Sequence, residues 1–263
     1  DLIIAARQGS PLAIGYGDGE MFLGSDALAL APMTQRITYL EDGDWAVIHR
    51  NGVVVRDKNG VITERPIQTT EVSGALTGKE GHVHFMLKEI YEQPQVIGDT
   101  LHSFLNPADQ TITLPELPFD LTDLPKITIS ACGTAFYAAL TAKYWFEKIA
   151  RVPVEVDISS ELRYRDMVMP EGGLAILISQ SGETADTLAA LRYCREQGQK
   201  ILSIVNVPES TIARESDAVL KTCAGPEIGV ASTKAFTTQL TVLACLAIAL
   251  ARAKGSISHE REA

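Results

Sequence analysis

The chain has 263 residues, enough for one large or two small domains with their own hydrophobic cores. Apolar residues make up 46% of it and charged residues 21%, which is typical of a soluble globular protein. The formal net charge of −10 argues against nucleic acid or an anionic membrane as the main partner. The cysteines are far apart and form no CxxC pair, which favours reduced cytoplasmic thiols over a disulfide framework or a zinc site. They are Cys132, Cys194, Cys223 and Cys245.

The N-terminus lacks the basic and apolar regions of a signal peptide. Because the chain begins at Asp1, within strand-like sequence, we expect it to be a fragment of a longer protein. The apolar stretch 240–251 is too short for a membrane span and is followed by Arg252 and Lys254. We therefore expect a buried core helix there.

Residues 1–65 have the pattern of an antiparallel β-sheet. Dipeptides that favour hairpin turns, such as Asp18-Gly19 and Asn51-Gly52, separate short apolar runs, and no long window has the 3.6-residue helical period. A short helical turn is expected near residues 25–30. The expected strands are residues 2–6, 12–16, 37–40, 45–49 and 53–56.

A loop, a helix and a linker follow. Residues 66–80 are polar and rich in Gly and Thr, which predicts a loop. Residues 84–101 have a helical pattern, with Pro94 expected to break or kink the helix. Residues 106–125 contain four prolines, which indicates a linker without strands or helices.

From Lys126 onward, strands and helices alternate. Helices separate successive apolar strands, and this predicts a parallel sheet with helices on both faces, that is, an α/β fold. The expected strands are residues 127–131, 152–158, 174–178, 201–205 and 218–222. The expected helices are residues 135–150, 160–165, 185–197 and 233–253.

In an open parallel sheet, ligands bind at the carboxyl ends of the strands, near helix N-termini. The strongest such segment is Ser179-Gln180-Ser181-Gly182-Glu183-Thr184. Hydroxyl groups and free helix N–H groups donate to anionic oxygens, and a glycine lets the backbone approach closely, so the segment suits a phosphate. The alternative is that Ser181 or Thr184 merely caps a helix.

Two further segments hold equivalent positions at strand ends. Cys132-Gly133-Thr134 precedes a helix, although a tight turn and a cap explain it equally well. Residues 227–234 lead into the last helix, with Ser232 or Thr233 as a candidate N-cap and Lys234 interpreted as a surface residue.

Other polar groups are given no function. His82 and His84 are interpreted as a solvated pair rather than a metal site, and we predict no metal and no cofactor. Glu89 and Glu92, three residues apart on the expected helix, are interpreted as a solvated face.

The three segments together resemble the sugar isomerase (SIS) domain. The motifs are SQSGET at 179–184, ACGT at 131–134 and EIGVASTKAFTTQL at 227–240. With KEIYEQP at 88–94 and the β-rich start, nearly the whole chain is similar to the glutamine–fructose-6-phosphate aminotransferase family, at the end of its glutaminase domain and its first SIS domain.

This resemblance implies a flavodoxin-like three-layer sandwich, preceded by part of an Ntn-type glutaminase. It implies phosphate ligands at Ser179, Gln180, Ser181 and Thr184, and a sugar pocket lined by Thr134, Val230, Ala231 and Ser232. Ala135 stands where the family pattern has Ser, which removes one hydrogen bond worth about 1 kcal/mol. The implied domains are residues 1–75 (glutaminase end), 76–120 (helix and linker), 121–255 (SIS domain) and 256–263 (tail).

The implied partners are fructose 6-phosphate and glucosamine 6-phosphate, with glutamine bound outside this chain and a homodimer in the cytoplasm. The glutaminase cysteine and the isomerase base are also expected outside the chain, so no catalytic residue is assigned. Two other hypotheses stay open: a non-catalytic SIS module that senses phosphosugars, and a scaffold that only dimerises.

Overall fold

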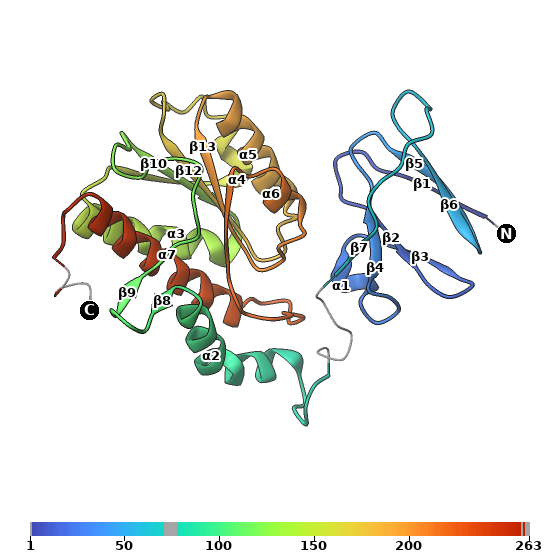
Figure 1. Ribbon diagram of the computed structural model, residues 1–263, viewed down its shortest axis with the longest axis horizontal. Coiled ribbons are helices and arrows are strands. Elements are labelled where there is room, and N and C mark those ends of the chain that lie inside the picture. Colours follow the sequence, from blue (N-terminus) through green and yellow to red (C-terminus); the bar gives the residue numbers. More distant parts are fainter. Residues whose placement is uncertain (1, 71–77, 259, 261–263) are drawn as a thin grey trace. The chain divides into compact units, whose positions relative to one another are not determined.

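The computed structural model describes residues 2–70, 78–258 and 260 (Figure 1). The chain divides into two compact units, Asp1–Gly78 and Lys79–Ala263. The domain boundary expected between residues 75 and 76 lies outside the described residues, as do residues 259 and 261–263 of the expected tail.

The first unit consists of two antiparallel sheets, as its turn dipeptides predict. All five expected strands form, and two short ones, β3 and β7, were missed. One sheet has the order β1 (Leu2–Ala6), β5 (Trp45–His49), β6 (Gly52–Arg56). The other has the order β3 (Met21–Gly24), β2 (Ala13–Tyr16), β4 (Arg36–Tyr39), β7 (Gln68–Thr69).

Side chains from both sheets share the core of this unit. On one side of β2, Ile14 packs with Ala46 and Ile48 of β5, and all three are at most 3% exposed. On the other side of the same sheet, Ile37 packs against α1 (Ala27–Leu30). This helix begins where the Asp26 carboxylate accepts the N–H of Ala29 at 2.8 Å, as expected for an N-cap.

The second unit is built on the five-stranded parallel sheet expected from the sequence. Its order is β11-β10-β12-β13-β14, the 2-1-3-4-5 order of flavodoxin-like folds. The register places Ala131, Ile158 and Ile178 side by side at the carboxyl edge. The strands are β10 (Ile127–Ala131), β11 (Val154–Ile158), β12 (Leu174–Ser179), β13 (Lys200–Val205) and β14 (Ala218–Lys221).

Helices cover both faces of this sheet, which gives three layers (Figure 1). One face packs on α3 (Gly133–Trp145) and α7 (Lys234–Ala253). The other packs on α4 (Ser159–Leu162), α5 (Ala185–Glu196) and α6 (Thr211–Arg214).

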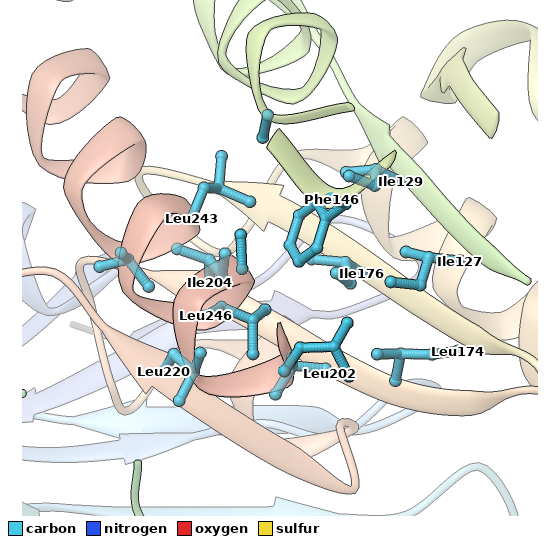
Figure 2. Packing of buried hydrophobic residues seen from close by; sticks show 14 of the residues in the cluster. Ile127, Ile129, Phe146, Leu174, Ile176, Leu202, Ile204, Leu220, Leu243 and Leu246 are labelled. Atoms are coloured by element: carbon cyan, nitrogen blue, oxygen red, sulfur yellow. The ribbon is translucent and has the colours of Figure 1, made fainter. Parts of the chain in front are cut away.

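Alternate residues of the buried strands point to opposite layers. In Figure 2, Ile129, Ile176 and Ile204 lie in one cluster with Phe146 and Leu246. Their strand neighbours Ala175, Leu177 and Val205 belong to the cluster on the other face. Because both faces are buried, the strands read as continuous apolar runs in the sequence.

Several local features differ from the expectations. Helix α2 (Phe85–His102) continues through Pro94, and the Ile90 carbonyl accepts the Gln93 side-chain amide at 3.1 Å. The expected linker contains a small hairpin of β8 (Leu105–Asn106) and β9 (Thr111–Ile112), with Asx-type hydrogen bonds in its turn. The helix expected over 135–150 is α3 followed by a π-helical turn, Phe146–Ala150.

Helix α7 is the one helix of the described residues with the length and apolar composition of a membrane span. Its most apolar window is 67% buried against the rest of the second unit. This burial supports the expected core helix, because core helices of water-soluble domains have the same composition.

Burial predicts which thiols react. Cys194 and Cys245 lie in the two core clusters, and burial raises the pKa of Cys194 to about 12 and that of Cys245 to about 11, so both stay protonated at pH 8. Cys223 is exposed. In the native chain at pH 8, Ellman's reagent should modify Cys223 and leave Cys194 and Cys245 unmodified until the chain is unfolded. Immediate modification of all four thiols would contradict this packing.

Candidate functional site

The strand order of the sheet reverses between β10 and β12. The chain leaves β10 into α3 on one face and leaves β12 into α5 on the other, which opens a crevice between the two loops. A cavity of about 380 Å³ lies there. All eight residues predicted for the site line it: Thr134, Ser179, Gln180, Ser181, Thr184, Val230, Ala231 and Ser232. The rest of its lining is Cys132, Gly133, Ala135, Ile178 and Gln239.

The loop after β12 is organised by its own hydroxyl groups. The Gly182 N–H donates to Ser179 Oγ at 3.0 Å, and the Glu183 N–H donates to Ser181 Oγ at 3.2 Å. Ser179 Oγ and Thr184 Oγ1 are 2.9 Å apart and share a hydrogen bond. Thr184 occupies the N-cap position of α5 without a side-chain capping bond, so its hydroxyl faces Ser179 instead of closing the helix.

Neighbouring loops hold this segment from outside. The carbonyl of Gln180 accepts the N–H of Asn206 at 3.2 Å, and the carbonyl of Gly182 accepts the N–H of Ile212 at 3.0 Å. Gly182 has φ +65°, and a Cβ there would lie 1.9 Å from Ser210 Oγ. Only glycine fits, because both the backbone conformation and the space exclude a side chain.

The site offers hydrogen-bond donors but no cation. The first N–H groups of α5, those of Ala185 and Asp186, have no intrahelical partner and carry the positive end of the helix dipole. No Lys or Arg is among the described residues that line the cavity. Hydroxyl groups, glutamine side-chain amides and backbone N–H groups are therefore the donors available for an anion.

Carboxylates hold the loop that carries Val230, Ala231 and Ser232. Glu89 of α2 is 2% exposed, and its Oε1 accepts the N–H groups of Ile228 at 2.6 Å and Gly229 at 3.0 Å. The interpretation of Glu89 as part of a solvated face is wrong, because its carboxylate is buried and accepts hydrogen bonds from two backbone N–H groups.

Glu227 closes the start of α7 in place of a capping hydroxyl. Its Oε1 accepts the N–H groups of Thr233 at 2.9 Å and Ala235 at 3.1 Å. Thr233 is in the N-cap position but makes no side-chain capping bond, and Ser232 faces the cavity instead.

Buried Lys234 forms an ion pair with half-buried Glu92, although both were expected at the surface. Lys234 is 4% exposed, and its Nζ donates to Glu92 Oε2 at 2.6 Å, so it is not a surface residue. Lys88 lies 3.4 Å from the other oxygen of Glu92. Burial disfavours the charged carboxylate, but these two ammonium groups outweigh it, so the pKa of Glu92 is lowered.

Gln239 is a cavity residue that the sequence analysis did not select. Its side chain is 3% exposed, and its Oε1 has no hydrogen-bond partner among the described residues. The sequence did contain an indication, since Gln239 is a long polar side chain within an apolar helix, and such a side chain needs a hydrogen-bond partner when it is buried.

Comparisons with known proteins agree with this geometry. Residues 120–249 match the SIS domain family. Over 262 residues, the chain is 60% identical to the glutamine–fructose-6-phosphate aminotransferase (isomerizing) of Brucella abortus and 58% identical to that of Zymomonas mobilis. Both alignments cover 100% of this chain and 43% of the relative, so the chain spans less than half the length of these proteins.

Solved structures give the same picture. The C-terminal domain of glucosamine-fructose-6-phosphate aminotransferase from Francisella tularensis has a TM-score of 0.67 and 48% identity, over 70% of this chain and 52% of that one. Glucosamine-6-phosphate deaminase from Thermotoga maritima has a TM-score of 0.55 and 25% identity, over 68% of this chain and 51% of that one. The resemblance expected from the motifs is confirmed.

Two glycines test how tightly the loop after β12 is packed. Gly133 and Gly182 both have positive φ, but a Cβ at Gly133 meets nothing within 4 Å. We expect Gly133→Ala to cost about 1–2 kcal/mol of unfolding free energy from backbone strain alone. Gly182→Ala should cost about 2–5 kcal/mol, because the clash with Ser210 adds to the same strain. Urea unfolding measures both, and equal costs would contradict the described contact.

Proposed function

Since residues 120–249 form a SIS domain and the whole chain is homologous to glutamine–fructose-6-phosphate aminotransferases, we propose that this chain holds the sugar phosphate for such an enzyme. The observation that carries the proposal is the cavity between the β10 and β12 loops, where all eight predicted residues meet. The complete reaction is the glutamine-dependent conversion of fructose 6-phosphate to glucosamine 6-phosphate.

The phosphate binds at the loop after β12. Ser179 Oγ accepts the Gly182 N–H and shares one hydrogen bond with Thr184. With Ser179 as the donor of that bond, the Thr184 hydroxyl proton is left to donate to a phosphate oxygen. Ser181 Oγ accepts one N–H within the loop and likewise keeps its proton for the ligand. Gln180 contributes its side-chain amide, and the first N–H groups of α5 complete a dianion site without a cation.

The sugar lies toward Thr134 and the loop of Val230, Ala231 and Ser232. No hydrogen bond of the described residues engages the backbone N–H groups of these three loop residues. They are therefore available to sugar oxygens, while the Gln239 carbonyl offers an acceptor for a sugar hydroxyl. Ala135 lines the same cavity and supplies no hydroxyl group.

The rest of the enzyme supplies the chemistry in this proposal. The relatives are more than twice as long as this chain, which leaves room for a glutamine site and for the base of the isomerisation. Residues 1–75 then form the end of the glutaminase domain, 76–120 the connecting helix and linker, 121–255 the first SIS domain and 256–263 a tail. A homodimer in the cytoplasm, which the motif resemblance implies, is part of this proposal.

Calorimetric titration of the chain with fructose 6-phosphate tests the phosphate assignment. A Ser181→Ala, Thr184→Ala double variant should bind about a hundredfold more weakly, because it loses two hydrogen bonds to a charged group at about 1.5 kcal/mol each. Ser103→Ala with Thr141→Ala is the matched control, since both hydroxyl groups donate to helix carbonyls. Unchanged affinity of the first variant would rule out the assignment.

The surrounding gene tests the choice of enzyme. A cysteine-started glutaminase should be encoded upstream and a second SIS domain downstream. A helix-turn-helix region in place of the glutaminase would instead indicate a phosphosugar-sensing regulator.

A further inference from the structure

Helix α2 packs against α7 in the second unit (Figure 1). It is far in sequence from the loop that carries Val230, Ala231 and Ser232, but it contacts that loop in space. It contributes no residue to the lining of the cavity. Even so, its buried carboxylate Glu89 contacts residues 228–229 of the wall segment (residues 228–232), of which Val230, Ala231 and Ser232 line that cavity.

Carboxylates hold the chain on both sides of residues 230–232, the part of the wall segment that lines the cavity. Glu89 accepts the N–H groups of Ile228 and Gly229, and Gly229 also lies 3.2 Å from the second oxygen of Glu89. On the far side, Glu227 accepts the N–H groups of Thr233 and Ala235. Between these two anchors, the backbone of residues 230–232 has no hydrogen-bond partner among the described residues.

Such a segment would vary in conformation without its anchors. Ile228, Val230 and Ala231 are exposed, and neither strand nor helix includes residues 228–232, so packing constrains this part of the chain little. Hydrogen bonds from backbone N–H groups to an ionised carboxylate are about twice as strong as neutral ones. Glu89 thus provides the strongest described contact at the start of the segment.

The close approach is built into the sequence at Gly229. A Cβ at this position would lie 2.5 Å from Glu89 Oε2 and 3.4 Å from the Cα of Met86. An added Cβ would therefore push the carboxylate away from the two amides, although the backbone of Gly229 does not have positive φ.

We propose that Glu89 is a positioning residue for the sugar end of the cavity, and that it fixes the backbone at Ile228 and Gly229 so that the free N–H groups of residues 230–232 meet the sugar. This inference rests on the proposed function. It separates two parts of one site: the phosphate is held by the loop after β12, which Glu89 does not touch, and the sugar is held by a segment that Glu89 orders.

Two ligands distinguish these parts. We expect Glu89→Ala to weaken binding of fructose 6-phosphate to the chain at least tenfold and to change binding of inorganic phosphate less than twofold. Glu89→Gln, which keeps one carbonyl acceptor, should fall between Glu89→Ala and the unchanged chain. Glu155→Gln is the matched control, since it removes a carboxylate paired with Lys126 and Arg165 at the opposite edge of the sheet and should change neither affinity.

Steric displacement provides an independent variant. Gly229→Ala leaves Glu89 in the chain but pushes it from its amides, and should reproduce the selective loss of fructose 6-phosphate. Gly98→Ala, also a glycine of this unit but with nothing within 4 Å of the added Cβ, should not. Equal weakening of both ligands, or none, in Glu89→Ala and Gly229→Ala would overturn the positioning role.

Amide hydrogen exchange tests the contact between Glu89 and its two backbone N–H groups without a ligand. The N–H groups of Ile228 and Gly229 should exchange at least tenfold faster in Glu89→Ala, while those of β12 stay protected. Unchanged exchange would overturn the inference even if Glu89→Ala binds weakly for other reasons. If the unchanged chain binds neither fructose 6-phosphate nor inorganic phosphate, the proposed function fails, whereas binding that Glu89→Ala leaves intact refutes only the positioning role.

Discussion

The reversal of strand order between β10 and β12 is the constraint on which the site depends. Parallel strands end at the same edge, and here the two adjacent strands send their helices to opposite faces of the sheet. The loops must diverge, and a crevice lined by the first residues of two helices follows from topology alone. The hydroxyl-rich sequence after β12 then determines what the crevice can hold, because its side chains and helix N–H groups present donors to an anion.

In a chain with net charge −10, no Lys or Arg of the described residues lines this cavity. The buried ammonium group of Lys234, which follows residues 230–232, is paired with Glu92. Charged side chains instead hold the backbone on either side of residues 230–232. Carboxylates of Glu89 and Glu227 take the N–H groups on both sides of residues 230–232 and leave those between them available. Hydrogen bonds between near neighbours thus organise the loop after β12, whereas a contact from the distant helix α2 holds the loop before α7.

The sequence was informative where function depends on neighbouring residues. The loop of Ser179 and Thr184, the strand ends and the sheet itself follow from short-range patterns, and the structure brings the eight selected residues into one cavity. Glu89 was misjudged because its partners lie about 140 residues away, and a charged pair at helical spacing reads equally well as a solvated face. The burial of Lys234 was hidden for the same reason, since its partner is on α2.

A crystal structure of the chain with fructose 6-phosphate would show whether the phosphate binds at the loop after β12. We expect phosphate oxygens within hydrogen-bond distance of Ser181 Oγ, Thr184 Oγ1 and the first N–H groups of α5, with the sugar directed toward residues 230–232. The cavity beside β14, about 590 Å³ and lined by Phe104, Lys221 and other residues, is the competing location. A phosphate bound there, with the loop after β12 empty, would contradict the account.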